Sequence, residues 1–308
     1  MKNIYKIYKQ LMTDSMKTVI PVLLASTLLS ACGGSSTDTT PVDGGPVIRG
    51  SKCLGTELGD KTSCVEINSR KAILYKEDNN EKEGIALFLH GSPGEASKVM
   101  GIFDAPMIAS KQNLVAISPQ GLDSTWGWLS NNTEINNDVS DVEYINELLT
   151  KVRAEHNVNS DKLYIFGYSA GGFMAYKLAC VIPEQISAIV SLAGQYRGSL
   201  LACENNTPLA IHHFHSTSDK EVPYNGRTRT SIKSVDQTIQ LWREKNACDE
   251  SISSQEHIRV TSSSSKTVTS IYNNCLASVT LSKMADVPHE ANYIGENLYQ
   301  IYQSIFNN

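Results

Sequence analysis

Short continuous runs of hydrophobic residues alternate along the chain with stretches of helical periodicity. The runs are Ile85–Leu89, Leu114–Ser118, Leu163–Phe166, Ala188–Leu192 and Leu209–Phe214. They lack the alternation of apolar and polar positions that is expected of a strand with one side in solvent. The pattern therefore predicts strands that are buried on both faces of a sheet.

The stretches between these runs predict helices. In residues 139–155 the apolar residues stand at positions 142, 145, 148, 149 and 152, which is an amphipathic helical pattern. Further helices are predicted at 171–181, 232–244 and 292–305. Strands that alternate with helices indicate the α/β class, with a mostly parallel sheet and helices on both faces. We find no internal repeat and no second linker, so residues 51–308 are interpreted as one domain.

The N-terminal region has a different character. Lysines at positions 2, 6, 9 and 17 precede an apolar stretch at 19–29 that is too short to span a bilayer. Small residues and then Cys32 follow, an order that resembles the lipobox of bacterial lipoproteins. We therefore expect residues 1–31 to be a signal peptide, Cys32 to be lipidated, and residues 32–50, rich in Gly, Ser, Thr and Pro, to be a flexible tether. An ordinary secretory signal and an uncleaved anchor are the alternatives.

Composition and charge limit the classes of partner that the protein can bind. The 308 residues are 41% hydrophobic and 19% charged, which is typical of a globular domain. The net charge is −5 and basic residues do not cluster, which argues against nucleic acid as a partner. The lipobox predicts membrane contact through the lipid anchor only. The expected location is the bacterial cell envelope, facing the periplasm or the exterior, with secretion as an alternative.

Export changes the interpretation of the 7 cysteines. Apart from Cys32 they are even in number, which suggests disulfides in an oxidising compartment. Many pairings are possible, and we expect the one that joins neighbours in short loops: Cys53–Cys64, Cys180–Cys203 and Cys248–Cys275. Neither a C-x-x-C motif nor a zinc-like spacing is present, so no metal site is predicted here.

Residues 167–171 read Gly-Tyr-Ser-Ala-Gly between a predicted strand and a predicted helix. In that context G-x-S-x-G forms a nucleophile elbow, whose glycines permit a tight turn that exposes the serine hydroxyl. The N-terminus of the next helix favours developing negative charge. Ser169 is therefore the predicted nucleophile. The alternative is a tight glycine turn in which the serine is incidental.

Residues 89–94 read Leu-His-Gly-Ser-Pro-Gly directly after another predicted strand. A His-Gly turn in this place commonly supplies a backbone N–H to an oxyanion hole. Pro93 has no N–H, so we assign this donor to Ser92 and the second donor to Ala170. His90 is expected to support the turn rather than to act in catalysis.

Asp219 follows the predicted strand at 209–214, and sites in open α/β sheets form beyond such strand ends. In the chain order nucleophile, acid, base, this position makes Asp219 the preferred orienting acid. The competing acids are Glu221, Asp236, Asp249 and Asp286.

Three histidines precede this acid and invite a metal interpretation. Neighbouring strand residues point to opposite faces, so of His212, His213 and His215 only the last two can share a face. No acidic or cysteine ligand is spaced with them. We therefore expect histidines that support the structure or the site, and no bound metal.

Two histidines follow Asp219 in the chain. His257 precedes a run rich in Ser and Thr that is typical of a solvated hairpin. His289 lies between a strand-like segment at 278–284 and the last predicted helix. His289 is therefore the predicted catalytic base.

With these residues identified, the segment 137–194 resembles the polyhydroxybutyrate depolymerase and feruloyl esterase family of α/β-hydrolases. Further similarity occurs at 87–94, 123–128, 222–226 and His289. The resemblance implies the α/β-hydrolase fold, the triad Ser169, Asp219 and His289, and a bond between Cys248 and Cys275. The chain has Ser216 where the family motif HG-x-x-D has glycine, and Ala291 where the family has a tryptophan beside the substrate. The resemblance therefore leaves the substrate open.

Together these residues predict a serine carboxylic-ester hydrolase that works through an acyl-enzyme and needs no cofactor. Expected substrates are small-molecule or oligomeric esters of short acyl, hydroxyalkanoate or cinnamoyl-type acids. Trp126 and Trp128 follow the strand at 114–118 and are predicted to line the acyl pocket, with a core position as the alternative.

Two other functions remain as alternatives. A secreted serine peptidase of the same fold would need a feature that binds a peptide N-terminus and usually an extra domain, and we find neither in the sequence. A lipoprotein that uses the fold only for binding would lack a triad member, and all three are present.

Overall fold

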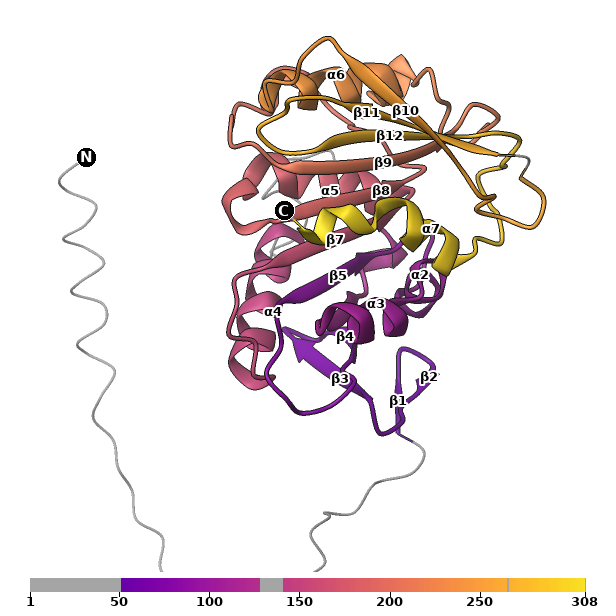
Figure 1. Cartoon of the computed structure of the whole chain (residues 1–308). Helices are drawn as coiled ribbons and strands as arrows, with labels where there is room; N and C mark the ends of the chain where they lie inside the picture. Colours follow the sequence, from indigo (N-terminus) through magenta and orange to yellow (C-terminus); the bar gives the residue numbers. More distant parts are fainter. Residues whose placement is uncertain (1–50, 128–140, 265, 308) are drawn as a thin grey trace, which may run out of the picture. The chain divides into compact units, whose positions relative to one another are not determined.

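The computed structural model describes residues 51–127, 141–264 and 266–307, which all belong to the unit Ile48–Asn308 (Figure 1). The predicted signal peptide, Cys32, the tether and Trp128 lie outside the described residues. The lipid anchor therefore stays a prediction. Among the helices that the structure describes, none combines the length and the apolar character needed to span a bilayer.

One large sheet organises the described part of the chain. From edge to edge its strands are β10 (Ile252–His257), β11 (Thr267–Tyr272), β12 (Val279–Met284), β9 (Ala210–Ser216), β8 (Ala188–Leu192), β7 (Leu163–Tyr168), β5 (Ile85–Leu89), β6 (Val115–Pro119), β4 (Arg70–Tyr75) and β3 (Thr62–Ile67). The strands from β12 to β6 run parallel, and the outer pairings are antiparallel. A small separate sheet pairs β1 (Lys52–Cys53) with β2 (Thr56–Glu57).

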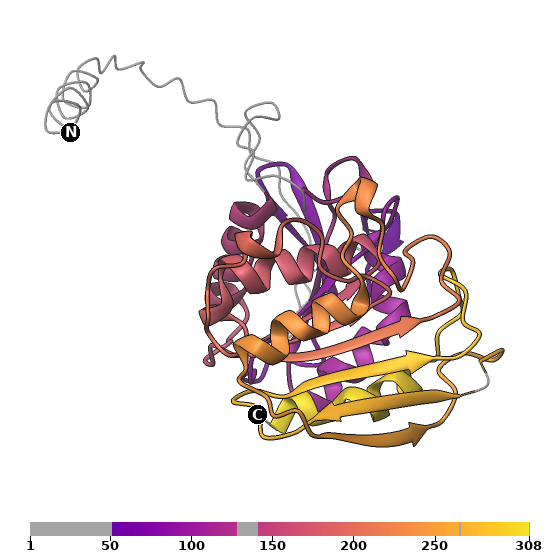
Figure 2. The same cartoon turned by 90° about the horizontal axis from the view of Figure 1, so that it is seen from above.

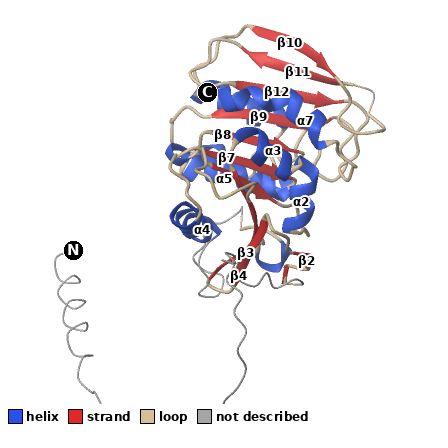
Figure 3. Ribbon diagram, turned by 60° about the horizontal axis from the view of Figure 1, so that its bottom comes forward, coloured by secondary structure: helices blue, strands red, loops and turns tan. Residues whose placement is uncertain are grey.

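Helices cover both faces of this sheet (Figure 2). The core on one face contains residues of α4 (Asp141–Glu155), α5 (Ala170–Val181) and α6 (Val235–Lys245). The core on the other face contains residues of α2 (Ala96–Phe103), α3 (Ala105–Gln112) and α7 (Gly295–Tyr302). Figure 3 shows the alternation of strands and helices from another side. The predicted α/β-hydrolase architecture is confirmed.

The central strands are buried along their whole length, as the continuous apolar runs predict. Every residue of β5, β7 and β9 is buried. These strands belong to the parallel part of the sheet, so their carboxyl ends lie at the same end of the sheet. The segments that follow them therefore converge, and they are the segments with the candidate catalytic residues.

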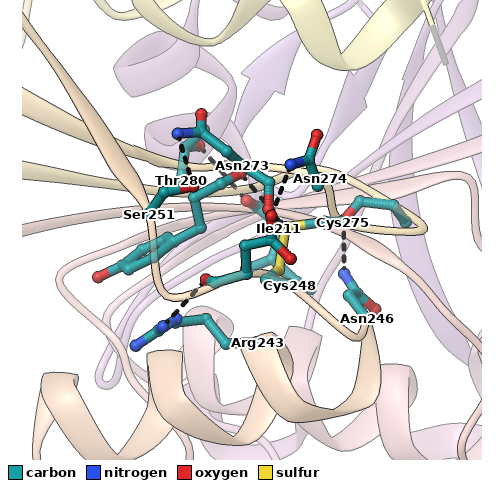
Figure 4. Close-up of a disulfide and its surroundings, with 12 residues drawn as sticks. Ile211, Arg243, Asn246, Cys248, Ser251, Asn273, Asn274, Cys275 and Thr280 are labelled. Carbon is teal, nitrogen blue, oxygen red and sulfur yellow. Dashed lines mark hydrogen bonds between the residues drawn. A yellow bond between two sulfur atoms is a disulfide. The ribbon is translucent and has the colours of Figure 1, made fainter.

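Within the described residues the structure contains three disulfides, at the three pairs that the sequence predicts. Cys53–Cys64 joins β1 to β3, and Cys180–Cys203 joins the end of α5 to a following 3-10 turn. Cys248–Cys275 joins the segment after α6 to the connection between β11 and β12 (Figure 4).

Candidate active site

Ser169 occupies a sharp turn between β7 and α5. Its backbone has φ 53° and ψ −117°, a conformation that L-residues rarely adopt. The flanking glycines permit this turn because the backbone passes very close to its neighbours. A Cβ on Gly167 would stand 2.3 Å from the Gly171 carbonyl oxygen, and one on Gly171 would stand 1.9 Å from the Leu89 oxygen. The geometry is that of a nucleophile elbow.

The structure brings Ser169, His289 and Asp219 into one chain of hydrogen bonds. Nε2 of His289 lies 2.9 Å from Oγ of Ser169, and Nδ1 lies 2.6 Å from Oδ2 of Asp219. The carboxylate can only accept, so Nδ1 carries the proton and Nε2 accepts from the serine hydroxyl. All three side chains are buried, with residue exposures between 5% and 8%. This arrangement allows His289 to take the Ser169 proton while Asp219 stabilises the resulting imidazolium.

The turn after β9 holds the carboxylate of Asp219 in position. Oδ1 of Asp219 accepts the backbone N–H groups of Glu221 (3.0 Å) and Val222 (2.8 Å), which leaves Oδ2 for His289. Both oxygens of the carboxylate are thus hydrogen-bonded. The carboxylate is therefore held by its own turn before any substrate binds.

Tyr168 holds His289 in position, a role that the sequence did not predict. Its hydroxyl donates to the His289 carbonyl oxygen at 2.9 Å, and its ring stacks on the imidazole with centroids 5.5 Å apart. Burial raises the pKa of the Tyr168 hydroxyl, so the hydroxyl stays a donor. The only sequence signal for this role is the place of Tyr168 directly before the nucleophile.

The two predicted oxyanion donors border the nucleophile. Ala170 begins α5, and Ser92 lines the same cavity as Ser169. The turn at Gly91 is so close that a Cβ there would lie 3.4 Å from Cβ of Ser169. Within the described residues, the backbone N–H groups of Ser92 and Ala170 have no protein acceptor. Both are therefore available to a substrate oxyanion.

His90 supports this turn from the buried side, as the sequence predicts. Its Nδ1 donates to the Gly91 oxygen at 2.7 Å, and its Nε2 accepts the Gly121 N–H at 2.9 Å. Burial lowers the pKa of His90, so the ring is neutral and keeps this pattern at neutral pH.

The position of Trp126 corrects the prediction that it lines the acyl pocket. Its Nε1–H donates to the His90 carbonyl at 2.8 Å, and its ring packs on the imidazole with centroids 4.7 Å apart. Only 3% of Trp126 is exposed, and it is not among the residues that line the cavity beside Ser169. The indole N–H needs a buried acceptor, and the His90 carbonyl provides one beneath the turn. Trp128 lies outside the described residues.

The three neighbouring histidines of β9 are all buried and hydrogen-bonded within the protein. Nδ1 and Nε2 of His212 contact the hydroxyls of Thr280 and Ser282. On the other face His213 and His215 lie side by side, 3.2 Å apart between Nε2 and Nδ1. Within the ranges that the structure describes, no His, Cys, Asp and Glu side chains gather in a way that could hold a metal ion.

A small cavity of about 30 Å³ opens beside Ser169 and His289. The turn at 90–95, residues of α2 and Tyr168 form most of its wall. Charged side chains border it: Lys98 pairs with Glu290 at 3.2 Å, and Glu95 and Glu221 complete the rim. The described wall thus has a polar, charged rim beside the serine.

Several known proteins are similar to this chain. The profile of the protein family described as phospholipase/carboxylesterase matches residues 71–257, a stretch that includes Ser169 and Asp219 and ends before His289. The probable feruloyl esterase C of Aspergillus clavatus is 27% identical over 180 residues, which are 56% of this chain and 62% of that protein. Feruloyl esterase D of Neurospora crassa is 22% identical over 212 residues, 66% of this chain and 65% of that protein. The chain thus spans less than two thirds of these relatives.

Among solved structures, an acetyl xylan esterase from Aspergillus awamori is similar with a TM-score of 0.59 at 13% identity. The match covers 79% of this chain and 99% of that chain. Esterase PE8 is similar with a TM-score of 0.51 at 12% identity, covering 80% and 99%. At this level of identity the likeness shows the fold.

Proposed function

This chain belongs to the phospholipase/carboxylesterase family, and from that premise we propose that it hydrolyses carboxylic esters through an acyl-enzyme on Ser169. The observation that carries the proposal is the pair of hydrogen bonds that His289 makes, to Ser169 at 2.9 Å and to Asp219 at 2.6 Å. The elbow geometry and the two available N–H groups support the same chemistry.

In the proposed reaction, Oγ of Ser169 attacks the ester carbonyl carbon while its proton passes to Nε2 of His289. The oxygen of the tetrahedral intermediate accepts hydrogen bonds from the N–H groups of Ser92 and Ala170, and losing one such donor typically costs about 3–4 kcal/mol. The C–O bond to the alcohol breaks as His289 returns its proton to the leaving oxygen. Water then attacks the acyl-serine with His289 again as base, and the acid is released.

The proposal covers esters of both short acyl and cinnamoyl-type acids. The cavity beside Ser169 has charged side chains on its wall, those of Glu95, Lys98, Glu221 and Glu290. The names of the relatives, feruloyl esterase and acetyl xylan esterase, make acetyl and feruloyl esters the first pair to compare.

We also propose that the domain works outside the cytoplasm. The three disulfides support this location, because structural disulfides persist in oxidising compartments and are rare in the cytosol. A lipid on Cys32 is part of the same proposal.

The test compares p-nitrophenyl acetate, a feruloyl ester and a peptide anilide as substrates of the wild type and of Ser169→Ala. We expect measurable kcat/KM for the acetate and for the feruloyl ester, whose ratio gives the acyl preference, and no hydrolysis of the anilide. Ser169→Ala should lose at least about a thousandfold in kcat and all labelling by a fluorophosphonate. Ser253→Ala, on the exposed edge strand β10, is the matched control and should behave as wild type. Hydrolysis or labelling that survives in Ser169→Ala would reject the assigned nucleophile.

A further inference from the structure

A row of three buried side chains runs from the nucleophile helix to the turn of the acid. Oη of Tyr176, on α5, lies 3.0 Å from Nδ1 of His213. Nε2 of His213 lies 3.2 Å from Nδ1 of His215, and Nε2 of His215 lies 2.8 Å from the Val222 carbonyl oxygen. Tyr176, His213 and His215 are each fully buried. The catalytic steps described above use none of these groups.

The hydrogen bonds in this row can point in only one direction. The Val222 carbonyl accepts only, so Nε2 of His215 must donate. A neutral His215 then has a lone pair on Nδ1, which accepts the proton on Nε2 of His213. Nδ1 of His213 is in turn an acceptor, and the Tyr176 hydroxyl donates to it. Burial lowers the pKa of both histidines, so both rings are neutral and this order is maintained.

Val222 is where the row meets the catalytic acid. Its N–H donates to Oδ1 of Asp219 at 2.8 Å, while its C=O accepts from His215. Both polar groups of this one residue are thus bound, one by the acid and one by the row. The His215 ring also lies beside the acid itself, with Nε2 3.6 Å from Oδ2 of Asp219, beyond hydrogen-bond distance.

We propose that His215 is a positioning residue for the catalytic acid: through the Val222 carbonyl it holds the turn that keeps Asp219 against His289, and Tyr176 and His213 fix the tautomer in which it can do so. The inference rests on the proposed ester hydrolysis at Ser169. The row ties the helix that begins beside the nucleophile to the turn that carries the acid. Ser169, at the start of that helix, and Asp219, in that turn, are therefore held at a fixed separation by the row.

Replacing the ring tests this role. His215→Phe keeps an aromatic ring but removes the donor to Val222, so kcat per titrated active site should fall about tenfold to hundredfold while KM changes little. His215→Gln can place an amide N–H near the position of Nε2, and it should recover most of that loss. Active sites are counted with a fluorophosphonate, and turnover is measured with p-nitrophenyl acetate. A residue needed only for folding would lower the number of titrated sites and leave the turnover of each site unchanged.

Two further variants keep the test decisive. Tyr176→Phe removes one hydroxyl at the far end of the row and should lower kcat per site by about twofold to fivefold. His212→Gln, in the same strand but hydrogen-bonded on the other face to Thr280 and Ser282, should leave kcat per site unchanged. If His215→Phe does not fold, Tyr176→Phe decides the question, and a kcat per site equal to that of the wild type rejects the positioning role.

The outcomes separate this inference from the proposed function. If the wild type shows no Ser169-dependent turnover, the proposed function is wrong. If the wild type turns over and both His215→Phe and Tyr176→Phe match it per titrated site, the positioning role is wrong. If His212→Gln falls as far as His215→Phe, the effect belongs to the strand as a whole, and the inference is rejected.

Discussion

Trp126 lies beneath the turn that carries Ser92, with its indole N–H on the His90 carbonyl. Trp126→Phe removes this donor and leaves a buried carbonyl unpaired, so it should lower the free energy of unfolding by about 1–3 kcal/mol. Trp126→Ala also leaves a cavity and should cost about 3–5 kcal/mol. Urea unfolding measures both.

The same variants test the position of Trp126 relative to the substrate. Because Trp126 is outside the cavity lining, the ratio of kcat/KM for acetyl and feruloyl esters should stay within about twofold of wild type in folded Trp126→Phe. A large change in that ratio with unchanged stability would return Trp126 to the acyl pocket.

Single residues differ in how far the sequence alone could predict their roles. Ser169 was predictable because its motif, its glycines and its place between strand and helix all require the same turn. Alternation along β9 predicts that His213 and His215 share a face. It does not predict what faces them, because Tyr176 comes from α5, whose packing on the strand is a tertiary property. Trp126 was ambiguous, since an indole suits a pocket wall and a core equally well.

At the scale of elements, buried strands were easier to predict than helix ends. The apolar runs locate β5, β6, β7 and β8 closely, because strands buried on both faces have few polar positions. The helix predicted from 232 begins only at Val235, because Ser234 caps it with a capping box that includes Gln237. The hairpin β3–β4 was not predicted, since its antiparallel strands, β3 at the edge of the sheet and β4 beside it, are only partly apolar.

The disulfide Cys248–Cys275 yields a prediction at this scale. It closes a loop with a sequence separation of 27, and the chain-entropy estimate for that length is about 3–4 kcal/mol. Cys248→Ala/Cys275→Ala should therefore lower the free energy of unfolding by about that amount, measured with urea. The loop of Cys53–Cys64 has a separation of 11, so the matched double variant there should lose about 0.8 kcal/mol less.

Activity should survive the loss of Cys248–Cys275. The bridge lies at the amino end of β9, whereas Asp219 follows its carboxyl end. Asn246 also holds this region, because its side-chain amide hydrogen-bonds to the backbone of Leu209 and Ala277. A kcat below half of the wild-type value in the folded double variant would contradict this separation between bridge and site.

At the scale of the whole molecule, the buried histidines link folding to pH. Burial lowers the pKa of His212 to about 3 and that of His215 to about 4, and it lowers the pKa of His213 well below its usual value. In the unfolded chain these rings titrate near pH 6.5. Between that value and the folded pKa values, the unfolded state binds more protons than the folded state. Stability is therefore fully present above about pH 6.5 and is lost as the pH falls below it.

The expected size makes this measurable. Each of the three histidines of β9 should lower the free energy of unfolding by about 1 kcal/mol between pH 6.5 and pH 5.5. His90, His156 and His257, whose pKa values burial also lowers, add to the same fall, so the total should be at least about 3 kcal/mol. Urea midpoints at several pH values measure the fall. In folded His212→Gln one titrating group is removed, and the fall should be about 1 kcal/mol smaller than in the wild type. Exposed carboxylates with lowered pKa values, such as those of Glu77 and Asp78, titrate below this interval and do not obscure it. A wild-type urea midpoint that does not change from pH 6.5 to 5.5 would mean that the histidines of β9 are not neutral in the folded protein. The order of hydrogen bonds from Tyr176 through His213 and His215 to Val222 depends on neutral rings, so it would then be wrong.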